Sequence, residues 1–125
     1  MSGVTFDSGA LIALDRNDRR VIALLARARE IGAHITLPAT ALAQAVRRPS
    51  RQVRLSRLAR QSTTEIAALD GADATRVGLL LAARRTSDIV DAHVVICARR
   101  NAQPIVTSDP DDLAHLDPEA RLIVV

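Results

Sequence analysis

The 125-residue sequence contains no tryptophan and no tyrosine, and Phe6 is its only aromatic residue. Stacking of exposed bases on aromatic rings is therefore excluded as a way for this protein to hold single-stranded nucleic acid. The absence of larger rings also means that the core must be built from leucine, valine, isoleucine and alanine.

Lysine is also absent, so that all 17 basic residues are arginines. Arginine favours planar, bidentate contacts with phosphate or carboxylate groups. The codon usage of a GC-rich genome produces the same bias without any selection for binding. The formal net charge of +3 is compatible with a polyanionic partner but is too small to identify one.

The sequence has a single cysteine, Cys97, which excludes an intramolecular disulfide. No apolar run approaches the roughly 18 residues of a membrane-spanning helix, and the N-terminal residues lack the charged and apolar regions of a signal peptide. We therefore expect a cytoplasmic protein that does not contact a membrane. A chain with 48% apolar and 25% charged residues fits one globular domain, residues 1–125.

Short apolar runs alternate with longer amphipathic segments along the chain. The expected strands are residues 4–6, 34–37, 66–69, 104–107 and 122–125. The expected helices are residues 19–31, 39–47, 51–61, 72–84 and 90–100. Strands that alternate with helices predict an α/β fold, a three-layer α/β/α sandwich with a central parallel sheet.

Four aspartates occupy places that a parallel sheet would bring together. Asp7 directly follows the first expected strand, and Asp109 follows the fourth. Asp88 and Asp91 open the helix that leads into that fourth strand. In a parallel sheet, the carboxyl ends of the strands and the amino ends of the following helices share one edge. Crowded carboxylates repel one another unless a divalent cation such as Mg²⁺ or Mn²⁺ binds them, so the sequence predicts a metal site at this edge.

Each aspartate also has an interpretation that needs no metal. Asp109 precedes Pro110 at an expected helix start, which is the pattern of an N-cap. Asp88 can cap the expected helix 90–100 that follows it or interact with the dipole of its first turn, and Asp7 can serve a turn. Asp91 is harder to explain in this way, because a favourable helix dipole contributes under about 1 kcal/mol. The three histidines, His34, His93 and His115, are scattered, and we expect core or surface roles for them rather than metal ligation.

Three segments resemble the acidic motifs of PIN-domain proteins: VTFDSGALIAL, SDIVDAHVVICARR and PIVTSDPDDL. The resemblance covers essentially the whole chain and is particularly to the VapC-type ribonuclease toxins of bacterial toxin–antitoxin pairs. It implies a PIN-like fold, metal-dependent endonucleolytic cleavage of RNA, a small antitoxin as partner, and a homodimer. By this resemblance Asp7, Asp91 and Asp109 are the catalytic, metal-binding acids, and Asp88 is a secondary one.

The chain departs from this family at the second acid, where the usual glutamate is replaced by Gln44. A glutamine offers a carbonyl oxygen to a metal, but it carries no negative charge and cannot act as a base. Either Asp88 supplies the missing charge, or the metal affinity is reduced and the chain is an impaired nuclease retained for binding. A PIN-like nuclease of RNA processing and a non-enzymatic binding module are the alternatives to a toxin.

Contacts with the substrate are expected from an arginine-rich segment, residues 47–61. Its arginines recur at intervals of mostly three residues: Arg47, Arg48, Arg51, Arg54, Arg57 and Arg60. This spacing predicts a basic stripe along helical segments, which suits the phosphates of RNA. A solvated helix face explains the same pattern equally well. Within the stripe, Arg47, Arg51 and Arg54 are the candidate substrate-binding residues.

Overall fold

Five short strands form one parallel sheet in the computed structural model, which describes residues 3–125. The strands are β1 (Gly3–Phe6), β2 (His34–Pro38), β3 (Thr64–Ala67), β4 (Ile105–Thr107) and β5 (Leu122–Val124). Their order across the sheet is β3-β2-β1-β4-β5, and every neighbouring pair is parallel. The predicted α/β class with a central parallel sheet is confirmed.

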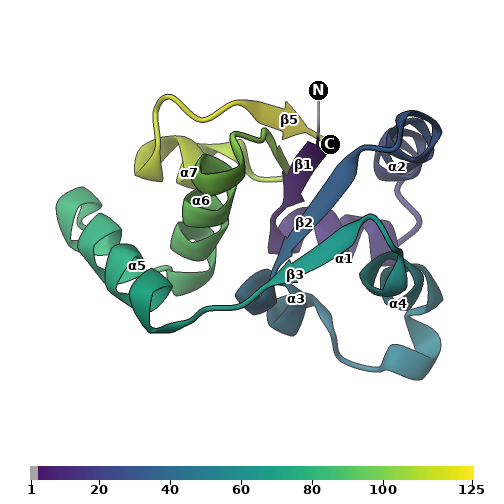
Figure 1. Ribbon diagram of the computed structural model, residues 1–125, viewed down its shortest axis with the longest axis horizontal. Helices are drawn as coiled ribbons and strands as arrows, with labels where there is room; N and C mark the ends of the chain where they lie inside the picture. Colours follow the sequence, from purple (N-terminus) through teal and green to yellow (C-terminus); the bar gives the residue numbers. More distant parts are fainter. Residues whose placement is uncertain (1–2) are drawn as a thin grey trace.

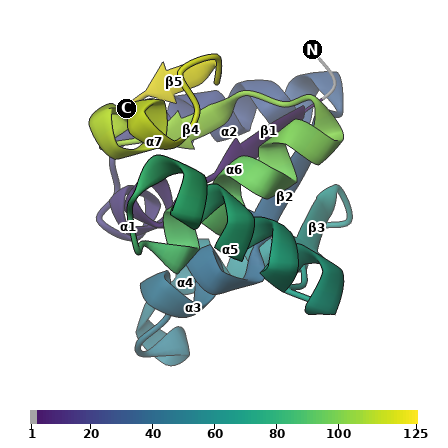
Figure 2. The same cartoon turned by 90° about the vertical axis from the view of Figure 1, so that its left-hand side faces the viewer.

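Helices cover both faces of this sheet. They are α1 (Ser8–Asp15), α2 (Arg19–Ile31), α3 (Ala39–Ala45), α4 (Val53–Arg60), α5 (Gly71–Arg84), α6 (Ile89–Asn101) and α7 (Pro110–Leu116), with a 3-10 helix η1 (Pro49–Arg51) before α4. Figure 1 places α5, α6 and α7 on one side of the strands and α1, α2 and α4 on the other. In Figure 2, α5 and α6 lie in front of the strands. The arrangement is the three-layer sandwich that the sequence predicts.

The core lies where α1 and α6 cover the central strands. In β1 every residue is buried, as expected for a parallel strand with helices on both faces. Residues 92–98 of α6 are also all buried, because this helix is enclosed by β1 and β2, by α3 and by α5. Asp91 stands immediately before this buried run, so its carboxylate lies where the core meets solvent.

Some boundaries differ from those expected from the sequence. The third strand begins at Thr64 instead of residue 66, because β3 pairs with β2 from Ile35 opposite Thr64 to Pro38 opposite Ala67. Its polar residues are tolerated because β3 is an edge strand. The helix 39–47 ends earlier, at Ala45, and the helix 51–61 is replaced by η1 followed by α4.

Helices α2 and α1 show which local signals make a helix predictable from the sequence. The helix 19–31 coincides with α2, which Asp18 caps at its start and Gly32 ends with a φ of +65° in the left-handed region. Helix α1 is not among the expected helices, because Ser8 and Gly9 are typical turn residues and the rest of the segment lacks a polar face. In residues 3–125, no helix has the length and apolar character required to cross a membrane.

Candidate functional site

Asp7 connects β1 to α1 at the carboxyl edge of the sheet. Its carboxylate accepts a hydrogen bond of 2.8 Å from the Ala10 backbone N–H, so Asp7 is the N-cap of α1. The side chain is only 4% exposed. Burial raises the pKa of this carboxyl above its ordinary value of 3.8; hydrogen bonds from Thr107 and Ala10 oppose the rise, and the charge of Asp109 adds to it.

Asp109 follows β4 and is exposed. Its side chain makes no capping hydrogen bond to α7, so the N-cap interpretation does not account for it. Instead, its backbone N–H donates to Thr107 Oγ1 at 2.9 Å. Gly9 permits the close approach of α1 to this loop, because a Cβ at Gly9 would lie 2.4 Å from the Ser108 Oγ. This approach brings Asp7 and Asp109 to one edge.

Asp88 and Asp91 begin α6. Asp88 is the N-cap and accepts a hydrogen bond of 3.0 Å from the Asp91 backbone N–H. The pKa of the Asp91 carboxyl is raised to about 7; burial is the largest cause, followed by the charges of Asp88, Asp7 and Asp112 and by a hydrogen bond to Asp88. The four predicted aspartates are therefore linked electrostatically: Asp91 interacts with Asp88 and Asp7, and Asp7 interacts with Asp109.

Two residues beside these acids were missed by the interpretation of the sequence. Asp112, in the first turn of α7, and His115, one turn later, line a cavity of about 300 Å³ together with Asp88 and Asp91. The His115 ring Nε2 lies 2.8 Å from the backbone carbonyl oxygen of Arg84, at the end of α5. The run of aspartates in DPDDL is the available sequence signal for Asp112, but the same run is also typical of the start of a capped helix.

Gln44 and the arginine-rich segment lie apart from this cavity. Gln44 is exposed in the last turn of α3. The Arg47 guanidinium donates to the backbone carbonyls of Ala43 at 3.1 Å and Val46 at 2.7 Å, so it satisfies the end of α3. Arg51 and Arg54 are exposed on η1 and α4.

Helix α1 sets the distance between the arginine-rich segment and the acids. The buried Gln52 side chain donates to Asp15 Oδ2 at 3.3 Å, which fixes the loop between α3 and α4 to the last residue of α1. Asp7 caps the other end of this eight-residue helix. At a rise of about 1.5 Å per residue, the two ends are roughly 12 Å apart. Arg51 therefore lies beside this far end, not at the acids.

The acidic edge offers several carboxylate oxygens, which are the donors that Mg²⁺ and Mn²⁺ prefer. Within residues 3–125, no three Asp, Glu, His or Cys side chains are grouped closely enough to hold one ion as they stand. Binding would thus require the carboxylates to move toward one another. Burial and, after it, repulsion from the neighbouring carboxylates raise the pKa of Asp91, and the positive charge of a bound cation would offset both.

No protein-family model matches the chain, and a search of curated proteins finds no match. The candidate site therefore rests on the positions of Asp7, Asp88, Asp91 and Asp109 around one edge of the sheet, with Asp112 and His115 beside them.

Proposed function

We propose that the protein is a divalent-metal-dependent endoribonuclease, a hydrolase of RNA phosphodiester bonds that acts as the toxin of a VapBC-type toxin–antitoxin pair. The observation that carries the proposal is the convergence of Asp7, Asp91 and Asp109, from three separate segments, at the carboxyl edge of a parallel sheet. The pKa of about 7 at Asp91 supports it. The folded protein makes ionisation of this carboxyl unfavourable when no cation is bound, so a bound cation would stabilise its ionised form.

In this proposal Asp7, Asp91 and Asp109 hold Mg²⁺ or Mn²⁺, and Asp88, an additional acid one helical turn before Asp91, is secondary. A bound cation of this kind supplies a more acidic water and positive charge to offset the charge that develops on the phosphate. Asp7 is held rigidly by its capping bond, whereas the exposed Asp109 is able to move toward the other acids.

Arg51 and Arg54 would contact RNA to one side of the scissile phosphate, because both lie roughly an α1 length away from the acids. Arg47 contributes less in this proposal, since its guanidinium is engaged with the end of α3. The cognate antitoxin and the homodimer rest on the family resemblance alone.

One observation favours a second candidate function. Gln44 removes a negative charge from the position of the family's second acid, and the exposed Gln44 side chain has no carboxylate hydrogen-bonded to it within residues 3–125. An impaired nuclease that acts as a binding module would show RNA binding without cleavage. A PIN-like nuclease of RNA processing would cleave RNA but cause no growth arrest that an antitoxin relieves.

The proposal is tested by RNA cleavage with Mg²⁺ or Mn²⁺, with and without a chelator. We expect cleavage to stop with the chelator and to fall at least about 100-fold in Asp7→Asn, the scale of loss on removing a group that stabilises charge in the transition state. Asparagine caps helices as well as aspartate does, so the fold is retained.

Asp18→Asn is the matched control, because it makes the same change at the N-cap of α2, away from the acidic edge. This variant should cleave RNA like the unmodified protein. Full activity of Asp7→Asn, or cleavage that persists with the chelator, would contradict the proposed metal site.

A further inference from the structure

A groove between α5 and α6 holds a cavity larger than the one at the acidic edge. Its volume is about 660 Å³, and it is lined by Arg76, Leu79, Leu80, Ile96, Arg99 and Arg100. Helix α5 packs on α6 and α7 instead of on the sheet, so it forms an outer wall of the molecule. The Leu79 side chain is 68% exposed, the largest value among the exposed large hydrophobic residues.

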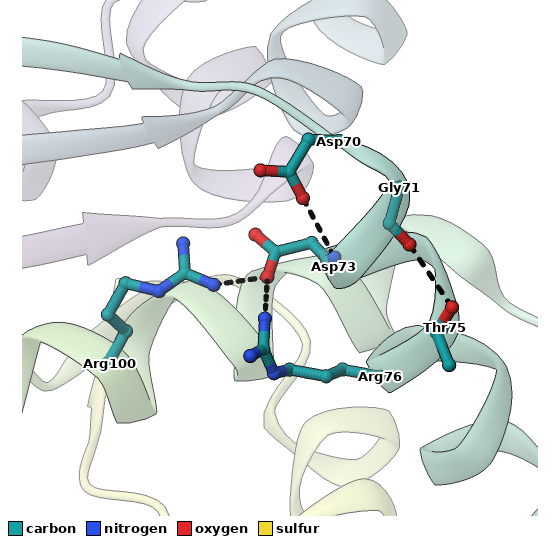
Figure 3. A network of polar contacts seen from close by, with 6 residues as sticks. All are labelled: Asp70, Gly71, Asp73, Thr75, Arg76 and Arg100. Atoms are coloured by element: carbon teal, nitrogen blue, oxygen red, sulfur yellow. Dashed lines mark hydrogen bonds and ion pairs between the residues drawn. The ribbon is translucent and has the colours of Figure 1, made fainter.

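Buried Asp73 organises two of the three arginines of this groove (Figure 3). It is 1% exposed, and its Oδ1 accepts hydrogen bonds from Arg76 at 2.9 Å and from Arg100. Asp70 caps α5 by accepting from the Asp73 backbone N–H at 2.8 Å. Both guanidiniums are therefore fixed beside a helix whose start is itself fixed.

The groove keeps a surplus of positive charge. Arg99 pairs through its Nε with Asp117 at 3.1 Å, so three guanidiniums face two carboxylates. Arg76 and Arg100 each use only one nitrogen in these bonds, and their other N–H groups have no acceptor within residues 3–125. Because a guanidinium carries five N–H donors, the arginines at the rim of the groove, Arg76, Arg99 and Arg100, can donate hydrogen bonds to further carboxylates.

We propose that the α5–α6 groove is a docking site for an amphipathic helix of another protein, with an apolar stripe flanked by aspartate or glutamate. Leu79, Leu80 and Ile96 form the apolar floor that receives the stripe, and the arginines of the rim pair with the flanking carboxylates. The 14 residues of α5 span roughly 21 Å, which matches a partner helix of about four turns.

The chemistry of the groove discriminates between this partner and two others. A nucleic acid strand would place some of its phosphates over the apolar floor of the groove, where no side chain donates a hydrogen bond to them. A second copy of this chain in a two-fold dimer would set the same patch against itself, so that Arg76, Arg99 and Arg100 would meet like charges. An acidic amphipathic helix satisfies both the floor and the rim.

The test is a selection of displayed 16-residue helical peptides, randomised in sequence, for binding to the full chain. We expect the selected peptides to carry leucine or isoleucine at helical spacing with flanking Asp or Glu. Binding should weaken about tenfold or more in Leu79→Gln and in Arg76→Gln, which remove a central apolar contact and a rim charge. Arg100 still pairs with Asp73 in Arg76→Gln, so α5 stays in place.

Matched controls are Val53→Gln, at an apolar residue 52% exposed on α4, and Arg20→Gln, at an exposed arginine of α2. Both should bind the selected peptides unchanged. Peptides that bind Leu79→Gln and Arg76→Gln as tightly as the controls would overturn the proposal. So would a dimer of the chain that Leu79→Gln dissociates in sedimentation equilibrium, or a single-stranded RNA whose binding Arg76→Gln weakens and Leu79→Gln does not.

Discussion

At the scale of single residues, Asp91 is the group on which the other acids act most strongly. Its pKa of about 7 means that, near neutral pH, the folded protein holds a proton there that the unfolded chain has already released. Burial is the main cause, followed by Asp88, Asp7 and Asp112. Ionised Asp91 is therefore a source of instability in the absence of a cation.

We predict that Asp91→Asn is more stable than the unmodified protein at pH 8 without metal. Because the folded pKa is raised, the stability that protonated Asp91 provides is complete below pH 3.8 and is lost as the pH rises through about 7. The difference in melting temperature between the two proteins should therefore shrink from pH 8 to pH 5.

Adding Mg²⁺ or Mn²⁺ at pH 8 should raise the melting temperature of the unmodified protein more than that of Asp91→Asn. The control is Asp111→Asn, an exposed aspartate at the start of α7, which should change neither the pH dependence nor the response to metal. A constant difference between Asp91→Asn and the unmodified protein over this pH range would contradict the prediction.

Gln44 is the second residue-scale test, because α3 packs on both α1 and α6, the helices that begin beside Asp7 and Asp91. If α3 brings residue 44 within about 4 Å of a divalent cation bound by the acids, the new carboxylate of Gln44→Glu gains several kcal/mol at an effective dielectric near 20, before desolvation and carboxylate repulsion are subtracted. We expect at least tenfold tighter Mg²⁺ or Mn²⁺ binding by calorimetry, an increment of about 1.4 kcal/mol.

Gln61→Glu, at the end of α4, is the matched control and should leave metal affinity unchanged. An unaltered dissociation constant in Gln44→Glu as well would mean that Gln44 does not occupy the position of the family's second acid.

At the scale of elements, Gln52 holds the loop between α3 and α4 in place. Its Oε1 accepts from the backbone N–H groups of Arg47 at 2.8 Å and Arg48 at 3.0 Å. Its Nε2 donates to the Ala45 carbonyl at 2.9 Å and to Asp15. One buried side chain thus satisfies the backbone that α3 leaves unpaired and orients the arginine-rich segment.

We predict that Gln52→Ala lowers the free energy of unfolding by about 2–4 kcal/mol, because several buried backbone groups lose their partners. Urea denaturation measures the loss, and limited proteolysis should show new cleavage within residues 46–52. Gln61→Ala is the control, since the Gln61 side chain makes no hydrogen bond within residues 3–125. Equal stability of the two variants would show that water replaces the Gln52 contacts without cost.

The elements that the sequence predicts best are those whose signals are local. Helix α2 has an aspartate cap, a periodic apolar face and a terminal glycine, and its bounds follow from these. The start of β3 cannot be predicted from local signals, because Thr64 and Glu65 form a strand only through their pairing with β2. Helix α1 has no polar face to reveal its period, since Ala10, Leu11 and Leu14 are all buried in the fold.

The candidate site also contains some residues whose positions the sequence predicts and others whose positions depend on tertiary packing. The meeting of Asp7, Asp91 and Asp109 follows from the order of strands and helices, because a parallel sheet collects such residues at one edge. Asp112 and His115 reach the cavity only through the direction of α7, which depends on tertiary packing against α6.

At the scale of the whole molecule, two acids respond to pH in opposite directions. The contribution of Asp91, at the acidic edge, to stability decreases as the pH rises, whereas the contribution of Asp73, in the first turn of α5, decreases as the pH falls. A hydrogen bond from Arg100 is the largest cause of the lowered pKa of Asp73; burial opposes it, and the bond from Arg76 and the charges of both arginines add to it. The two effects act on different layers, since α5 lies outside α6.

We predict that α5 opens locally in acid before the rest of the fold. Because the pKa of Asp73 is lowered, its stabilising contribution is present above the ordinary value of 3.8 and is lost as the pH falls below it. Native-state hydrogen exchange between pH 5 and pH 3, corrected for intrinsic rates, should show protection in α5 falling more than in α6. Asp73→Asn should lower protection in α5 at pH 5 and abolish its pH dependence, whereas Asp111→Asn should leave both unchanged. If protection fell equally in α5 and α6, the prediction would be wrong. Helix α5 would then be held by the packing of Val77, its other buried residue, and not by the ion pairs of Asp73.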